Sequence, residues 1–386
     1  MNAQQTPKST SVNQLEEYSD EIKADRKSKN PSKTIRLINT YSVNNVGDAA
    51  IYAALFFLAK ENGFDHVQTL GLDNVVGKIE RYIGFESSQQ SSGNPDAYLA
   101  VGGDIFNNAR PKLITRQFLK NVDQLKKSPS STVLFGQSIP RSCHGLSFRY
   151  LCHYLKKLNH VVVRDVESFK RLSACGVENR LSYDAAFAVP INQRHHFEIE
   201  KFNTLPFNRL ALLSLRSFGQ LYPQNDELFQ QELIQLVTRL NNHGLIPAVM
   251  LQADVNNSDS DQRMIENIKQ YTNIEVINPF TIHQTLRHIS PWQIAQAYIA
   301  QAKIVIGVRY HTAIFRLLSG KMPFNIFYSN KGEDLCNRLN VPGVEVQQFS
   351  VDKHFQSIIN SGNKLFDPRG IIEQVTKDFQ LAMLRV

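Results

Sequence analysis

The sequence predicts an α/β protein built from two Rossmann-like, doubly wound domains that face each other across a cleft. The chain has 386 residues, a length that suits two domains of roughly 150 residues each. Short apolar runs of strand length alternate with longer amphipathic stretches of helix length, as is typical of parallel sheets covered by helices. A polar stretch after residue 190 interrupts this alternation once, and the alternation then starts again.

The first domain is predicted at residues 35–190. An apolar run at 35–38 leads through a polar turn into a helix at Asp48–Glu61, and Asp48 is placed to cap the start of this helix. The following strands are expected at 97–101, 132–135 and 161–163, and the helices between them at 111–126 and 148–158.

A linker is expected at residues 191–208, because this stretch is polar and contains Pro206. Residues 209–345 are predicted to form the second domain, and residues 346–386 a C-terminal segment whose helix can pack back across the domains. Strands are expected at 210–214, 245–251, 273–277, 304–307 and 324–327, and helices at 226–242, 291–301, 310–319 and 371–384.

Composition indicates a globular protein, since 42% hydrophobic and 20% charged residues exclude a mainly disordered or fibrous chain. The net charge of +8 favours anionic ligands or surfaces without identifying nucleic acid. The longest apolar run, Ala49–Ala59, is too short for a bilayer, which needs about 20 residues in a helix. The four cysteines lack paired spacing, so neither a disulfide framework nor a structural zinc site is indicated.

The first 34 residues are polar and are expected to form a mobile tail without a signal peptide. The basic end of this tail, Lys23–Lys33, is either a solvated segment or is attracted to an anionic membrane surface. We therefore expect a cytoplasmic protein, with peripheral association at the inner face of the membrane as the alternative.

Several common signatures are absent from the sequence: the G-x-x-x-x-G-K-[ST] phosphate loop, G-x-G-x-x-G and H-E-x-x-H. P-loop kinases, dinucleotide enzymes and zincins therefore have no support. Short polar clusters instead follow the predicted strands of the first domain. They contain Asn45, Gly47 and Asp48, then Gly103 and Asp104, Gln137, Arg164 with Asp165 and Ser168, and Asp184.

Each cluster of the first domain has a structural explanation beside a functional one. Gly47 and Gly103 permit tight turns and also let a ligand approach the backbone, and free amides at a helix start can hold an anion. Asp48 suits a helix cap or, alternatively, a catalytic role. An ion pair together with helix capping explains the cluster at 164–168 without a function.

The second half supplies positive charge at two predicted strand ends. Arg216 follows the strand at 210–214, and Arg309 and His311 follow the strand at 304–307. Arginine offers a planar fork that matches carboxylate or phosphate, and histidine exchanges a proton near neutral pH. Together these residues predict an anion-binding site at the edge of the cleft.

The order of the clusters resembles the polysaccharide pyruvyl transferase family from about residue 36 to residue 340. Each element is short, and the ordered series carries the resemblance. The matching features are Asn45-x-Gly47-Asp48, Gly102-Gly103, the segment 136–140, Arg164-Asp165-x-x-Ser168 with Leu172 and Gly176, Asp184-x-Ala186-Phe187, Ser214-Leu215-Arg216, Arg309-x-His311, Gly320-x-x-Pro323, Tyr328 and Lys331.

The resemblance implies a two-domain fold of the GT-B glycosyltransferase type, and phosphoenolpyruvate as a substrate rather than a cofactor. The family forms a carboxyethylidene ketal across two hydroxyls of a sugar and releases phosphate. By resemblance, Arg216 and Arg309 bind the carboxylate and phosphate of the donor, Lys331 adds a contact, and His311 is the acid. No metal is needed in this scheme.

The resemblance also implies that the first domain is the acceptor side, for a glycan or a lipid-linked oligosaccharide. Asp48 is the first candidate for the base, and Asp104 and Asp184 are the others. The family often has glycine where Asp104 and Ile139 stand, so this chain departs from the pattern on the acceptor side. Acceptor-binding or cleft-lining roles are expected for Asn45, Gly47, Gly103, Asp104, Gln137 and Asp184.

Two other classes of function fit the same residues. One is a GT-B glycosyltransferase that uses a nucleotide sugar, and the other is a non-catalytic protein that binds a glycan or an anion. The complete set of Arg216, Arg309 and His311 speaks against a loss of catalysis. Nucleic-acid binding is not expected, because the sequence lacks a dense basic and aromatic stripe.

Overall fold

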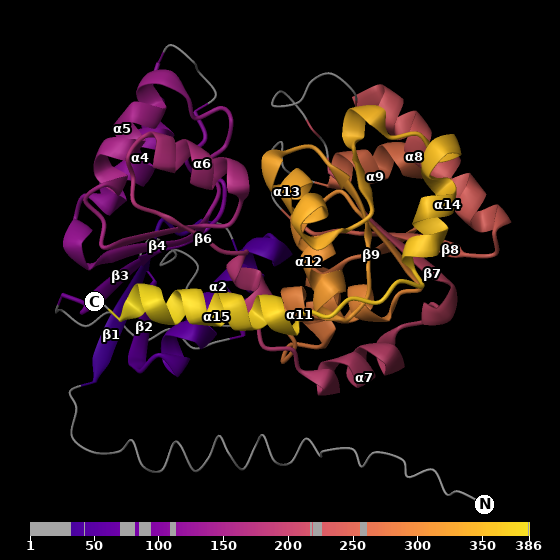
Figure 1. The fold of residues 1–386 in the computed structure, drawn as a ribbon. Coiled ribbons are helices and arrows are strands. Elements are labelled where there is room, and N and C mark those ends of the chain that lie inside the picture. The colour runs from indigo at the N-terminus through magenta and orange to yellow at the C-terminus, as the bar shows by residue number, and fades with distance from the viewer. Residues whose placement is uncertain are drawn as a thin grey trace, which may run out of the picture.

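The chain folds into two α/β units that lie side by side in the computed structural model (Figure 1). The predicted N-terminal tail lies outside the described residues as far as residue 31. The structure describes residues 32–41, 43–69, 82–84, 94–108, 113–216, 218, 226–254, 261–384 and 386.

Six parallel strands form the first sheet, which helices cover on both faces (Figure 1). In spatial order the strands are β2 (Phe64–Thr69), β1 (Lys33–Ile38), β3 (Ala97–Ala100), β4 (Thr132–Gln137), β5 (His160–Val163) and β6 (Arg180–Leu181). One face packs against α4 (Arg116–Leu125), α5 (Gly145–Leu155) and α6 (Val166–Ala174), and the other against α2 (Val46–Glu61) and the short helix η3 (Ala185–Ala188). The short helix η2 (Pro129–Ser131) precedes β4.

Six parallel strands also form the second sheet, so the alternation in the sequence predicted the class of both units. In spatial order they are β12 (Gly343–Glu345), β11 (Phe324–Phe327), β10 (Ile304–Gly307), β7 (Leu210–Ser214), β8 (Ile246–Met250) and β9 (Glu275–Ile277). The helices are α8 (Asp226–Asn242), α9 (Gln262–Lys269), α10 (Pro279–Thr285), α11 (Pro291–Gln301), α12 (Tyr310–Leu318) and α13 (Asn330–Leu339).

Helix α2 lies in the layer that joins the two units. It packs against the first sheet and also against α11 and α12 of the second unit. Its sequence, VGDAAIYAALFFLAKE, is buried over most of its length, as expected of a helix that is apolar on all sides. Because α2 packs against both units, it holds the strand ends of the two units at a common edge.

The C-terminal segment returns to the first unit after contacting the second. Helix α14 (Val351–Ser361), which follows the short helix η6 (Val346–Gln348), packs against α8, β10 and β11. Helix α15 (Arg369–Met383) then crosses to the first sheet, where the ring of Phe379 packs against Phe135 at 5.2 Å between centroids. The buried carboxylate of Asp378 pairs with Arg180 on β6.

Several elements differ from the prediction. Asn45, rather than Asp48, caps α2, because the helix begins two residues earlier than expected. The predicted linker contains α7 (Gln193–Phe202), which packs against α11, and the short helix η4 (Phe207–Arg209). The strand at 324–327 is not the last, since β12 follows it, and β2 was missed because Asp65, His66 and Gln68 interrupt its apolar pattern.

None of the helices in the described part of the chain is both long enough and apolar enough to span a membrane.

Candidate functional site

A cavity of about 610 Å³ lies between the two units, at the carboxyl ends of their strands. The first unit contributes residues that follow β1, β3, β4 and β5 and part of the first turn of α2. The second contributes residues that follow β7, β8, β10 and β11. Eight of the eleven residues for which the sequence predicts a catalytic, donor-binding, acceptor-binding or cleft-lining role line this cavity: Asn45, Asp48, Gly103, Asp104, Arg216, Arg309, His311 and Lys331.

Three predicted cleft residues do not line the cavity: Gly47, Gln137 and Asp184. Gln137 is the last residue of β4 and is completely buried. Its side-chain amide donates to the carbonyl of Gly103 at 2.7 Å and to that of Ser138 at 2.9 Å. Gln137 therefore joins the ends of β3 and β4 and does not have the cleft-lining position expected for it. Gly47 and Asp184 lie directly behind lining residues.

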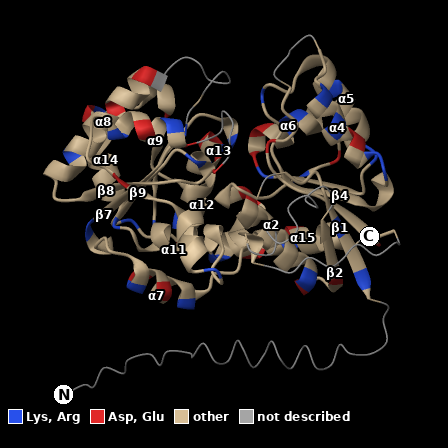
Figure 2. Ribbon diagram, turned by 180° about the vertical axis from the view of Figure 1, so that it is seen from behind, with Lys and Arg blue, Asp and Glu red and all other residues tan. Residues whose placement is uncertain are grey.

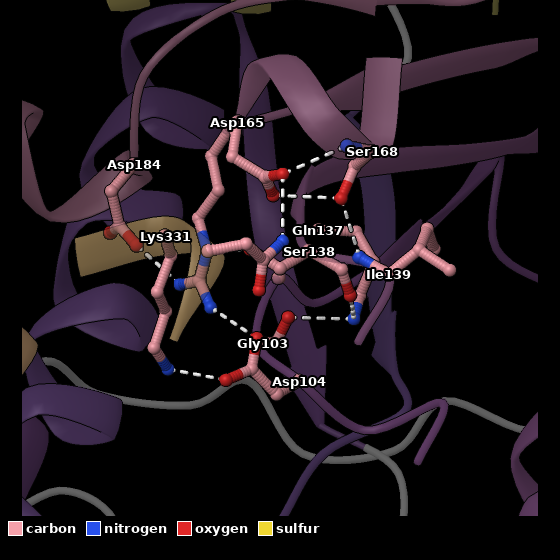
Figure 3. A network of polar contacts seen from close by, with 12 residues as sticks. Gly103, Asp104, Gln137, Ser138, Ile139, Asp165, Ser168, Asp184 and Lys331 are labelled. Atoms are coloured by element: carbon pink, nitrogen blue, oxygen red, sulfur yellow. Dashed lines mark hydrogen bonds and ion pairs between the residues drawn. The ribbon is translucent and has the colours of Figure 1, made fainter. Parts of the chain in front are cut away.

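A buried guanidinium, Arg164, organises the first-domain wall of the cavity. It donates to Ser138 Oγ at 2.8 Å and to Asp104 Oδ1 at 2.9 Å, and it also pairs with Asp184. Figure 3 shows how these carboxylates and Lys331 gather around one guanidinium. The sequence offered an ion pair together with helix capping as the structural explanation of the cluster at Arg164 and did not place this residue at the cavity, which it lines.

The cluster that follows Arg164 has the capping role expected for it. Asp165 caps α6 by accepting from the backbone amide of Ser168 at 2.8 Å. Its carboxylate also accepts from Asn330 of α13 at 3.0 Å, and Asp334 of α13 accepts from the amide of Val166 at 3.1 Å. The start of α13, which carries Lys331, is thereby held against the first unit.

Charge pairing keeps the first-domain carboxylates ionised. Desolvation would raise the pKa of Asp104, but the Lys331 ammonium and the Arg164 guanidinium outweigh it and lower this pKa to about 2. Burial likewise opposes ionisation of Asp184, yet Arg164 and His311 hold its pKa well below the usual range. Lys331 comes from the second unit, so this pairing also ties the two units together.

His311 lies where the two units meet, in the first turn of α12. Its Nε2 is buried without a hydrogen-bond partner and lies 3.7 Å from Oδ2 of Asp184. Burial lowers the pKa of His311; Asp184 opposes this effect, and the charges of Arg164 and Lys331 add to it. Burial therefore favours the neutral form of the imidazole. Nε2 is thus enclosed on the side of Asp184, and His311 lines the cavity.

Gly47 makes room for this imidazole. A Cβ atom at position 47 would lie 2.0 Å from Nδ1 of His311, far inside van der Waals contact. The amide of Gly47 donates to the Asn45 side chain at 2.9 Å, which fixes the turn that brings the glycine against the ring. Glycine is needed here for close approach rather than for an unusual backbone conformation.

Arg309 is held by a carboxylate that sequence reasoning missed. Its Nε donates to Oδ1 of Asp261 at 2.9 Å, and Oδ2 of Asp261 accepts the amides of Gln252 and Ala253 at 2.7 and 3.0 Å. Burial raises the pKa of Asp261 against the influence of Arg309 and these amides. Because 48 residues separate Asp261 from Arg309 in the sequence, no local motif marks the pair.

Arg216 follows β7 and lines the second-unit wall of the cavity. Its guanidinium contacts the hydroxyl of Tyr328 and lies 4.9 Å from the centroid of that ring. Tyr328 follows β11 and lines the cavity beside Ser329, so Arg216 is supported by an aromatic face.

The cavity as a whole is basic and suits an anionic ligand. Its lining carries five Lys and Arg side chains against two carboxylates, Asp48 and Asp104. In the described part of the chain, no group of three His, Cys, Asp or Glu residues is arranged to hold a metal ion.

Solved structures with the same architecture are distant in sequence. The UDP-GlcNAc 2-epimerase of Neisseria meningitidis bound to UDP-GlcNAc is 11% identical, with a TM-score of 0.59 over 92% of this chain and 100% of that one. A putative UDP-N-acetylglucosamine 2-epimerase of Listeria monocytogenes has the same identity and TM-score over 90% and 94%. Anabaena HepE in complex with UDP and glucose is 10% identical, with a TM-score of 0.50 over 91% and 100%. These likenesses confirm the GT-B-like fold.

Comparison at the level of sequence families gives the more specific result. No curated protein sequence matches the chain. The model of the family described as polysaccharide pyruvyl transferase matches residues 45–330, from the cap of α2 to the start of α13. This range is well over half of the 386 residues and contains nearly every residue that lines the cavity. The chain therefore belongs to the polysaccharide pyruvyl transferase family.

Proposed function

We propose that the protein transfers the enolpyruvyl-derived group of phosphoenolpyruvate to two hydroxyls of a sugar, in a surface polysaccharide or its precursor. The product is a carboxyethylidene ketal, and phosphate is released. One observation carries the proposal: Arg216, Arg309, Lys331 and His311 line one basic cavity and come from three strand ends of the second unit. A donor with a carboxylate and a phosphate requires such an arrangement of fixed cations beside a proton donor.

The arginines would bind the two anionic groups of the donor. Arg309 is buried and held by Asp261, so its fork is oriented before the ligand arrives. The guanidinium of Arg216 packs over the ring of Tyr328. Lys331 would neutralise the developing charge on the phosphate as it leaves.

His311 would act as the acid that protonates the methylene carbon of the donor. Its pKa is lowered in the ligand-free protein, and the negative charge of a bound donor would raise it. The proton would move to the methylene carbon, which becomes the methyl group of the product. Asp184, 3.7 Å from Nε2, would position the ring and stabilise the charged imidazole.

The two sugar hydroxyls would then add in turn to the carbon that carried the phosphate. Attack by the first hydroxyl forms one C–O bond, and attack by the second forms the other while the bond to phosphate breaks. The first hydroxyl proton restores His311, and the second leaves with phosphate, so the protons balance. Asp48 lines the first-domain side of the cavity and would relay the proton of the second hydroxyl to the departing phosphate.

Calorimetric titration with phosphoenolpyruvate alone is the test that requires no knowledge of the acceptor. We expect saturable binding, lost in Arg309→Ala and kept in Arg287→Ala, an exposed arginine outside the cavity. A panel of nucleotide sugars in the same assay tests the glycosyltransferase alternative. Binding of a nucleotide sugar in place of phosphoenolpyruvate would overturn the proposal, whereas binding of neither would favour a non-catalytic relative.

A further inference from the structure

The positive charge of the chain is concentrated in one segment. Residues 113–158, which contain α4 and α5, hold eight Lys and Arg against one acidic residue, Asp123. This excess of seven positive charges is nearly as large as the net charge of the whole chain, which is +8. Residues 209–345, by contrast, hold 12 Lys and Arg against 11 Asp and Glu. The first unit therefore has a basic layer that the second lacks.

Most of this charge lies on the outside of one helical layer. Helices α4 and α5 pack side by side, joined by a hydrogen bond of 2.8 Å from Lys126 to the hydroxyl of Tyr150. Figure 2 shows Lys and Arg along both helices. Six cations on these helices or directly after them are exposed, and we call them the basic face: Arg116, Lys120, Lys127, Arg149, Lys156 and Lys157.

The single acidic residue does not offset the basic face. Asp123 pairs with Lys126 at 2.6 Å and is thus neutralised within the layer. Among the described residues, no ion pair is recorded for any of the six cations of the basic face. The face therefore presents unneutralised charge to the solvent, where it attracts an extended anionic partner over a Debye length of roughly 8–10 Å.

Two large apolar side chains stand at one end of the same layer. Leu113 precedes α4 and is 63% exposed, and Leu146 in the first turn of α5 is 65% exposed. This end also borders the cavity, because Gln117 near the start of α4 and Ser142 before α5 line it. Exposed leucines beside lysines and arginines are the combination that interfacial membrane binding uses, with apolar groups entering the acyl boundary and cations at the headgroups.

We infer that the basic face, with Leu113 and Leu146, docks on an anionic lipid bilayer. Docked in this way, the protein keeps the first-domain edge of the cavity next to the headgroups. An acceptor carried on a membrane lipid can then reach the cavity without leaving the bilayer; this consequence for the acceptor rests on the proposed function, whereas the docking itself does not.

A bilayer fits the basic face better than nucleic acid or a soluble polyanion. The six cations account for attraction to any of these partners, but the two leucines contribute only where an apolar phase is available. No exposed aromatic side chain, which would stack on bases, is present among the large exposed hydrophobic residues of this layer.

The test is sedimentation of the full-length protein with vesicles of phosphatidylcholine, with and without phosphatidylglycerol. We expect binding to the anionic vesicles alone, weakened by salt. The triple variant Lys120→Glu/Arg149→Glu/Lys156→Glu should bind at least about tenfold more weakly. The triple variant Arg263→Glu/Lys269→Glu/Arg287→Glu changes the net charge equally on exposed positions of the second unit and should bind like the wild type. Both retain residues 1–31, so any contribution of that segment is common to them.

Two further measurements decide between the partners. Leu146→Ser should weaken binding to vesicles and leave binding to dextran sulfate and duplex DNA unchanged. The inference is overturned if both triple variants bind vesicles equally, or if soluble polyanions bind as tightly as vesicles and Leu146→Ser has no effect. Calorimetry with phosphoenolpyruvate on the same variants separates this result from the proposed function: if the wild type fails to bind the donor, the proposed function fails while the vesicle result stands.

Discussion

The Cα of Gly47 and the imidazole of His311 come from different units of the fold and touch: a Cβ at position 47 would lie 2.0 Å from Nδ1 of the ring. Gly47 is the second residue of α2, and His311 is the second residue of α12. The orientation of the proposed acid therefore depends on the helix that joins the two units.

Gly47→Ala should reduce turnover strongly while preserving donor binding. The new methyl group must displace the ring, and a shift of about 1 Å in a catalytic group costs up to roughly a hundredfold in rate. We expect the affinity for phosphoenolpyruvate to stay within about tenfold of the wild-type value, because the arginines are not displaced. The assay is phosphate release with an acceptor, next to calorimetry with the donor alone.

Gly370→Ala is the matched control for Gly47→Ala. A Cβ at Gly370 has no heavy atom within 4 Å, so this variant should behave like the wild type. Full turnover in Gly47→Ala would show that the ring can move without loss and would remove its fixed orientation from the mechanism.

Binding of the donor should be coupled to proton uptake at His311. In the ligand-free protein the pKa of His311 is lowered, mainly by burial. A bound anion raises that pKa, so between the two values binding takes up a proton, and affinity falls as the pH rises through this window. Titrations in buffers of different ionisation enthalpy measure the uptake.

The variant His311→Gln separates this proton from protons exchanged by the phosphate of the donor. It should bind phosphoenolpyruvate within about tenfold of the wild type but take up fewer protons, and its turnover should be abolished. Equal proton uptake in the two proteins would mean that His311 does not change its charge when the donor binds.

Local patterns were sufficient to place the residues that the second unit contributes to the cavity. Arg309 and His311 follow a short apolar run that is completely buried as β10, so both the strand and the position of its end are visible in the sequence. The carboxyl ends of parallel strands meet at one edge, which is why residues as distant as Arg216 and His311 could be placed together.

The supporting residues could not be predicted, because their contacts join distant parts of the chain. Asp261 reaches Arg309 across 48 residues, and Lys331 reaches Asp104 across 227. The prediction that Gln137 lines the cleft was wrong for another reason. The register of a strand decides whether its last side chain points to the cavity or into the sheet, and the sequence pattern at 136–140 does not reveal this register.

Arg164→Met should destabilise the fold by about 3–5 kcal/mol, since it leaves the buried carboxylate of Asp184 without the guanidinium that it pairs with. Urea denaturation at pH 7 measures the loss. The comparison is Arg369→Ala, because Arg369 and its partner Asp367 are both exposed, and an ion pair between exposed groups contributes little to stability. Equal stability of the two variants would show that the network around Arg164 contributes little.

The same network predicts an acid dependence of stability. The folded-state pKa of Asp104 is about 2, against an ordinary value of 3.8, so its ionisation stabilises the fold above the ordinary value. This contribution is lost as the pH falls through the folded-state pKa. The difference in stability between the wild type and Arg164→Met should therefore narrow from pH 4 downwards, and denaturation curves along this range would reveal a constant gap if Arg164 acted only through packing.

Arg309→Ala should weaken binding of the donor by about 2–5 kcal/mol, roughly 30- to 5,000-fold, if the charge that Arg309 binds is left buried and unpaired. The variant also leaves the buried carboxylate of Asp261 without its guanidinium partner, which lowers the free energy of unfolding as well as the affinity for the donor. The double variant Arg309→Ala/Asp261→Asn addresses this, because it removes the buried negative charge together with the positive one. If Arg309 contacts the donor, the double variant should regain stability in urea but not affinity for phosphoenolpyruvate. If affinity returns together with stability, Arg309 supports the fold of the cavity and does not touch the ligand.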